Sequence, residues 1–369
     1  MSDPSPICTP TLFLKVPGSP VETSLQEFNK ELGESTDFDD LVDKTYALLT
    51  QHQLNIQEAL AVWETRLTLH LFNNQLSYAK KEAINLNNAL YLQENPNPAP
   101  LPGGNRSRGN SVGSSTPPLQ PIYPLPKNKA ATIEYDLLVL LLRLKSIPNM
   151  NLINELYKLN FQMRLKSDLD EDVLRMKLIN LSYDIMVILS VTKNHATLLN
   201  YLHGLRLELE RIESKRAASA KSDAYSTYLS NVILVQIIIE SIVHKQKKTP
   251  SLELIIAAQY GELFKRINEE TKRSLIYVLR HILPTITENQ MVAYDKSELS
   301  LDDLIGLVAE DKISVRIICS MLGLWDLSNN YGFQLSGETE ISYGPVGTSL
   351  TNQVTNNWYK YINKVYGLE

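Results

Sequence analysis

The segment Gly109-Asn-Ser111-Val-Gly113 matches the G-x-S-x-G pattern of a serine nucleophile. In enzymes, that serine sits at a sharp turn between a strand and a helix. Both flanks of the segment here are rich in Pro, Ser and Gly, which favour neither element. We therefore interpret the match as accidental.

Histidines and cysteines give equally little support to chemistry. His195 and His203 are eight residues apart and do not share the i, i+4 spacing of helical metal ligands. Cys8 and Cys319 are too few for a disulfide framework or a cysteine-based metal site. The chain also contains no phosphate-cradling glycine motif and no H-E-x-x-H zinc helix. We predict no catalytic residue, no metal and no cofactor, and hence a protein that is not an enzyme.

Phosphorylation is the chemistry that the sequence does offer. Minimal proline-directed sites are Ser5-Pro6, Thr9-Pro10, Ser19-Pro20 and Thr116-Pro117. Arg108 lies three residues before Ser111, in the segment Arg106-Ser-Arg-Gly-Asn-Ser. The candidate modified residues are Ser107, Ser111 and Thr116. Added negative charge there would change how a segment carrying two arginines docks.

The prolines show which elements surround these residues. Five of the 18 prolines fall within residues 1–20 and nine within 96–126, which leaves four for the rest of the chain. A long stretch so poor in helix breakers, and rich in Leu, Ile, Glu and Lys, predicts helices. From this division we expect the following segments: a disordered leader at 1–36, helical hairpins at 37–93, a linker at 94–128, a helical solenoid at 129–330, a polar loop at 331–352 and a helix at 353–369.

Apolar residues recur at helical spacing on both sides of the linker. The first hairpin turns at Asn73-Asn74, and a later one turns at Lys193-Asn194. Hairpins that bury their apolar faces only against neighbouring hairpins make an α-solenoid. We predict an all-α, tetratricopeptide-like solenoid with one long disordered insertion. The end of that insertion, with Ile122 and Tyr123 among prolines, is a candidate to dock as an extended segment.

One hairpin fits the tetratricopeptide pattern in part. Trp63 occupies the bulky first position and Ala79 the small-residue position of the second helix. Leu67 and His70 depart from the residue types usual at their positions. We expect Trp63 to be a core anchor and His70 to pack or cap rather than catalyse.

Charge and hydropathy exclude further classes. The balance of 36 basic against 41 acidic residues gives no footprint for nucleic acid. The N-terminus lacks the pattern of a secretory signal. The most apolar run, residues 229–243, is shorter than the roughly 20 residues that a bilayer requires. We expect a soluble intracellular protein with no transmembrane segment.

Aromatic residues near the C-terminus are candidates for binding other proteins: Trp358, Tyr359, Tyr361 and Tyr366. With Ile362 and Val365, Trp358 makes one apolar face at helical spacing. The alternative is that this helix caps the solenoid by covering its last apolar face.

The run from Trp63 to Leu86 and the later run from Leu174 to Leu209 carry a family resemblance. Together, separated by a linker, they resemble the tetratricopeptide-repeat subunit (subunit twelve) of the TRAPP vesicle-tethering complex, in a fungal version. The resemblance covers residues 40–215. It implies a non-catalytic scaffold that contacts TRAPP core subunits, at the cytoplasmic side of Golgi and ER–Golgi membranes, in secretory or autophagic traffic. The alternatives are a generic adaptor in another assembly and a helical enzyme with an unrecognised site.

Overall fold

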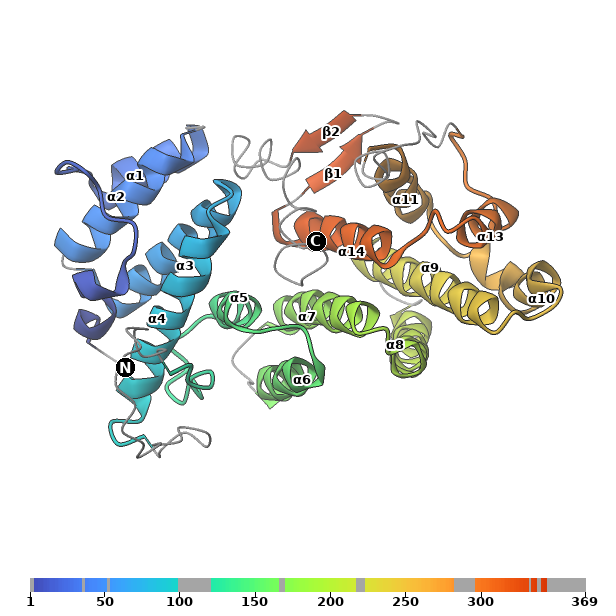
Figure 1. The fold of residues 1–369 in the computed structure, drawn as a ribbon, viewed down its shortest axis with the longest axis horizontal. Coiled ribbons are helices and arrows are strands. Elements are labelled where there is room, and N and C mark those ends of the chain that lie inside the picture. The colour runs from blue at the N-terminus through green and yellow to red at the C-terminus, as the bar shows by residue number, and fades with distance from the viewer. Residues whose placement is uncertain are drawn as a thin grey trace, which may run out of the picture. The chain divides into compact units, whose positions relative to one another are not determined.

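The computed structural model describes residues 3–34, 37–51, 54–98, 121–165, 170–216, 223–281, 296–331, 333–336 and 340–343. The chain divides into two compact units, Met1–Ile147 and Pro148–Glu369, and each is described by itself. Figure 1 shows that helices make up almost all of the described chain. The predicted all-helical fold is therefore confirmed, with one short two-stranded hairpin added to it.

The first unit is built on the predicted hairpin. Its helices are α1 (Leu25–Glu34), α2 (Phe38–Gln51), α3 (Ile56–Phe72), α4 (Leu76–Glu94) and α5 (Tyr135–Lys145). Asn55 begins α3 with a capping box, in which its side chain and that of Glu58 each accept the other's backbone N–H. The turn between α3 and α4 has Asn74 in the left-handed region, at φ 57°, which asparagine tolerates better than most residues.

Helix α2 is capped by the aspartate that precedes it, while Asp39 and Asp40 lie in its first turn. The carboxylate of Asp37 accepts the backbone N–H groups of Asp39 and Asp40, each at 3.1 Å.

The N-terminal residues differ from the prediction of a disordered leader at 1–36. Residues 5–7 and 10–12 form 3₁₀ turns, and residues 25–34 form α1. Ile7 and Phe28 are fully buried, or nearly so, and Phe13 is also buried. Helical periodicity could not reveal the docking of residues 5–13, because Ile7 and Phe13 are single apolar side chains, separated by turns, that insert into a surface formed by later helices. Helix α1 does carry Leu25, Phe28 and Leu32 at helical spacing.

The end of the linker docks as the sequence suggested. Tyr123 stacks on Tyr91 of α4 with ring centroids 5.0 Å apart. Asn88 of α4 donates to the Pro121 carbonyl at 2.8 Å and accepts the Tyr123 N–H at 3.1 Å. The predicted boundary at residue 129 is corrected as well, because α5 packs on α4 and α3 and so belongs to the first unit.

The second unit contains α6 (Met150–Leu165), α7 (Glu171–Val191), α8 (His195–Arg216), α9 (Asp223–Gln246), α10 (Leu252–Phe264), α11 (Glu269–His281), α13 (Leu301–Ala309) and α14 (Val315–Tyr331). Consecutive helices from α6 to α10 pack against one another, and α14 returns to pack on α7. The turn predicted at Lys193-Asn194 is confirmed, with Lys193 at φ 54°. A turn with Asp311 at φ 59° separates α13 from α14.

Helix α9 is deeply buried in this unit. All residues from Tyr228 to Ile239 are buried. Tyr225–Gln246 is long and apolar enough to cross a membrane by length and composition, a longer stretch than the run considered in the sequence. However, 72% of its most apolar window is buried inside the fold, as in the core helix of a helical bundle.

The polar loop predicted at 331–352 contains a hairpin. Strand β1 (Phe333–Ser336) pairs antiparallel with β2 (Glu340–Tyr343), with Phe333 opposite Tyr343. Strand β1 lies beside α14 and α11 (Figure 1). Both strands, Phe-Gln-Leu-Ser and Glu-Ile-Ser-Tyr, alternate apolar and polar residues, but over four residues, the shortest run that indicates a strand.

Candidate functional site

A surface groove of about 800 Å³ lies within the second unit, between α6, α7, α8 and α9. Its apolar and aromatic lining includes Leu174, Leu178, Tyr201, Leu205 and Tyr228. These residues come from one face of each helix, so the groove follows from how consecutive helices stack. A concave apolar surface with a few polar groups is the usual form of a binding site.

Tyrosines form part of the groove lining. The ring of Tyr157 on α6 meets that of Tyr201 on α8 edge-on, with centroids 6.3 Å apart. Deeper in, the Tyr228 hydroxyl donates to Ser182 Oγ at 2.6 Å. Burial raises the pKa of both Tyr201 and Tyr228, so both phenols stay neutral at physiological pH. They offer surface and hydrogen bonds, not a base.

Charges at the groove are balanced. Arg164 of α6 lies 3.8 Å from Glu208 of α8. Arg175 of α7 pairs with Glu171 on the preceding turn, and its guanidinium lies over the Tyr225 ring, 5.8 Å from the centroid. The groove therefore presents both signs of charge around an apolar floor, an arrangement suited to a peptide or protein surface.

Gly204 leaves space in the groove. It lies in the middle of α8, where glycine disfavours a helix by about 1 kcal/mol relative to alanine. A Cβ built on it would meet no heavy atom within 4 Å. A glycine inside a leucine-rich helix is the one signal in the sequence that could have indicated the groove.

Beside the groove, α6 carries apolar side chains that face solvent. Phe161 is 63% exposed and Leu165 is 68% exposed, and with Tyr157 they step along the helix every four residues. The opposite face of α6 is the buried one, through Leu152, Leu156 and Leu159. Helix α6 is thus apolar on two faces, and the described part of the chain covers only one of them.

A second cluster lies in the first unit, where α3 and α4 each contribute one buried charge. Arg66 and Glu82 form a two-pronged ion pair, with Nε–Oε2 at 2.7 Å and Nη2–Oε1 at 2.9 Å, and both side chains are 0% exposed. Burial alone raises the pKa of Glu82, but hydrogen bonds from His70 and Arg66, and their charges, outweigh it and lower the pKa to about 2.

This ion pair holds the backbone of the N-terminal residues. Glu82 Oε1 accepts the N–H groups of Leu14 and Lys15, at 2.8 and 3.1 Å. Arg66 Nη2 donates to the Lys15 carbonyl at 2.7 Å, and Arg66 Nη1 donates to the Val42 carbonyl at 2.8 Å. Glu82 is therefore a structural acceptor whose two oxygens are fully engaged.

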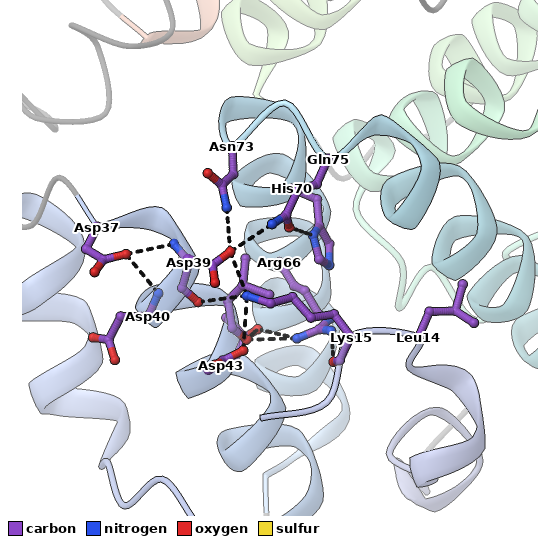
Figure 2. A network of polar contacts seen from close by, with 12 residues as sticks. Leu14, Lys15, Asp37, Asp39, Asp40, Asp43, Arg66, His70, Asn73 and Gln75 are labelled. Carbon is purple, nitrogen blue, oxygen red and sulfur yellow. Dashed lines mark hydrogen bonds and ion pairs between the residues drawn. The ribbon is translucent and has the colours of Figure 1, made fainter. Parts of the chain in front are cut away.

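Figure 2 shows how Asp39 connects this cluster to the α3–α4 turn. Its carboxylate accepts from Lys15 Nζ, Asn73 Nδ2 and Gln75 Nε2, each at 2.7 Å. The hydrogen bond from Lys15 is the main cause that lowers the pKa of Asp39. His70 contacts Gln75 Oε1 at 2.8 Å and Glu82 Oε2 at 3.2 Å, so its expected packing role is confirmed.

The low pKa of Glu82 predicts a pH dependence of stability. The folded state binds fewer protons than the unfolded state between the ordinary pKa of 4.5 and about 2. Stability from this group is therefore complete above pH 4.5 and is lost as the pH falls through that window, by about 3 kcal/mol. Hydrogen exchange of α3 and α4 peptides against pH would measure it. In Glu82→Gln, the free energy of unfolding should no longer fall by this amount between pH 4.5 and about 2. An identical pH dependence in the variant and the unmodified protein would contradict the assignment.

The structure describes some of the candidate residues named from the sequence and not others. Trp63 is a fully buried core anchor, as expected. The candidate phosphorylation residues Ser107, Ser111 and Thr116 and the aromatic residues Trp358, Tyr359, Tyr361 and Tyr366 lie outside the described residues. Among the residues that the structure does describe, no group of three or more His, Cys, Asp or Glu side chains could hold a metal ion.

These features define an all-helical protein with an apolar surface groove and a closed, buried polar network. No protein-family model matches the sequence, no curated protein is significantly similar to it, and no solved structure matches it significantly.

Proposed function

We propose that this protein is a non-catalytic scaffold that binds other proteins through the groove between α6, α7, α8 and α9. The observation that carries the proposal is the groove itself, an apolar surface with balanced charges beside the exposed residues Phe161 and Leu165. Exposed apolar patches rimmed by polar groups mark interaction sites. In this reading the helices α6 to α10 stack as tetratricopeptide-like hairpins, and an apolar partner helix is a natural occupant of such a groove.

We further propose that the assembly is a TRAPP-like vesicle-tethering complex in ER–Golgi or autophagic traffic, with the protein in the cytoplasm at the membrane periphery. What supports this is the resemblance of residues 40–215 to the tetratricopeptide subunit of that complex. The helical hairpins α3–α4 and α7–α8 stand at the two runs that carry the resemblance. The partners would be other protein subunits, and contact with the membrane would be indirect.

Filling the groove tests the scaffold proposal. Gly204→Leu places a bulky side chain in the open space on α8, and we expect at least a tenfold loss of co-purifying subunits from full-length protein tagged at its native level. Gly261→Leu is the matched control, because Gly261 is also helical and a Cβ built on it would also meet no heavy atom within 4 Å. It lies on α10, outside the groove, and should retain the partners.

The composition of the recovered complex decides between the alternatives. A stoichiometric set of tethering subunits supports the TRAPP-like assignment. An unrelated set that is lost in Gly204→Leu and kept in Gly261→Leu supports the generic adaptor and overturns the tethering assignment. Equal recovery of partners from the unmodified protein and from both variants would reject the groove as the binding site. A monomer that turns over a small molecule would support the alternative that the protein is an enzyme.

A further inference from the structure

We propose that Ser5 is a phosphorylation site for a proline-directed protein kinase, and that its modification releases residues 3–16, the N-terminal segment, from α3 and α4. The inference is independent of the proposed scaffold function. It rests on how this segment is held and on where Ser5 stands within it.

The N-terminal segment runs antiparallel to α4. Gln93 Nε2 donates to the Asp3 carbonyl at 2.9 Å, and Asn85 Nδ2 donates to the Leu12 carbonyl at 2.9 Å. Further along, Glu82 accepts the Leu14 N–H at 2.8 Å. Side chains of α4 thus bind the backbone of the segment on both sides of its two 3₁₀ turns.

Two apolar side chains, Ile7 and Phe13, also anchor the segment. Ile7 is fully buried, and its carbonyl accepts a hydrogen bond from Trp63 Nε1 at 2.7 Å. Phe13 stacks on the Trp63 ring with centroids 4.7 Å apart. The Arg66 guanidinium lies 5.0 Å from the centre of the Phe13 ring, a favourable cation–π distance. Two anchors and a few backbone contacts make a reversible attachment, which local unfolding can open.

Ser5 stands two residues before the first anchor. It is exposed and is followed by Pro6. Its hydroxyl donates to Asp3 Oδ1 at 2.6 Å, and its backbone N–H donates to the same oxygen at 2.9 Å. These bonds fix the first residue of the 3₁₀ turn Ser5–Ile7, which the Ile7 N–H closes by donating to the Pro4 carbonyl at 2.9 Å. The last residue of the turn is the buried anchor.

A phosphate on Ser5 turns the attraction between Ser5 and the Asp3 carboxylate into a repulsion. The hydroxyl proton that Asp3 accepts is gone, and a group of about −1.5 to −2 charge stands beside the Asp3 carboxylate. Like charges repel at this distance, so the 3₁₀ turn that holds the two groups together and places Ile7 is disfavoured. In the undocked segment this turn can open, and the two groups can move apart. Modification therefore shifts the population toward the open segment.

The chemistry is an ordinary phosphoryl transfer. In the open form the kinase binds the extended Ser5-Pro6 segment. The Ser5 Oγ forms a bond to the γ-phosphorus of ATP, the bond from that phosphorus to the bridging oxygen breaks, and ADP leaves. The hydroxyl proton passes to the base of the kinase.

The two cysteines of the chain provide the readout. Cys8 is half-buried in the N-terminal segment, and Cys319 is buried in α14 and serves as the internal reference. Burial and the nearby Asp3 raise the pKa of the Cys8 thiol. Added phosphate charge alone would slow its reaction with a disulfide reagent, so faster labelling reports release of the segment.

The experiment treats the purified full chain with a proline-directed kinase and ATP, maps the phosphorylated residues, and measures Cys8 labelling and exchange of the Leu14 and Lys15 amides. We expect phosphate on Ser5 and at least a tenfold rise in both rates. Ser5→Ala should abolish the rise. Ser19→Ala removes the same motif from an exposed site outside the segment and should leave the rise unchanged.

Three outcomes would overturn the inference. One is the absence of phosphate from Ser5 after extended treatment. Another is phosphate on Ser5 with unchanged Cys8 labelling and amide exchange. The third is a rise that persists in Ser5→Ala, which would assign the release to another residue such as Thr9.

Discussion

Replacing Arg66 by methionine is expected to destabilise the α3–α4 hairpin by about 3–5 kcal/mol, because the Glu82 carboxylate stays buried without its cation. The Val42 and Lys15 carbonyls lose their donor in the same variant. Hydrogen exchange of α3 and α4 peptides in increasing urea measures this loss. It reports on this hairpin alone, which matters because two units need not unfold together.

Two further variants identify the origin of the loss. Glu82→Leu alone should also be strongly destabilising, whereas the double variant Arg66→Met/Glu82→Leu should recover a large part of it, because no buried charge remains. Lys158→Met, which removes an exposed pair with Glu155 on α6, should change the stability measured by exchange of the α6 peptides by no more than about 0.5 kcal/mol. If the single and double variants were additive, the two charges would not be coupled and the ion pair would have no role of its own.

Trp63→Ala is expected to lose about 3–5 kcal/mol, since it empties a fully buried site. It also removes the donor to the Ile7 carbonyl and the ring that stacks on Phe13. The N-terminal segment should therefore detach as well, and Cys8 should react faster with a thiol reagent. Exchange of α3 and α4 peptides and Cys8 labelling are the two measurements.

Trp63→Phe separates packing from the hydrogen bond. It keeps an aromatic ring against Phe13 but loses the donor, so we expect a loss of about 1–2 kcal/mol. Leu92→Ala, on an exposed part of α4, should cost less than about 1 kcal/mol. Equal losses for Trp63→Ala and Trp63→Phe would show that the hydrogen bond, and not the filled volume, is what Trp63 contributes.

Much of the helical fold was predictable because its signals are local. Asn73-Asn74 and Lys193-Asn194 end one helix and begin the next within a few residues, and the apolar period on either side needs no knowledge of partners. The N-terminal residues and the β1–β2 hairpin were not predictable in this way. Ile7 and Phe13 find their partner at Trp63, about fifty residues away, and β1 needs β2 to exist at all.

The candidate groove was also only partly predictable from the sequence. Apolar residues at helical spacing predicted the helices on either side of the turn at Lys193-Asn194, but not which side chains would be left at a concave surface. That depends on the stacking of four helices, which brings Tyr157, Tyr201 and Tyr228 together. The Arg66–Glu82 ion pair was likewise not predictable, because nothing in the sequence indicates that two charged residues 16 positions apart will meet in the core.

The sequence by itself determined the helices, their turns and the absence of known catalytic motifs, because these depend on neighbours within one or two helical turns. Only the tertiary structure decided that the N-terminal residues are a bound segment rather than a disordered leader, and where the groove lies. The physical reason is that one buried side chain or one buried ion pair outweighs the weak local preferences of a proline-rich segment, and such partners come together only when the chain has folded.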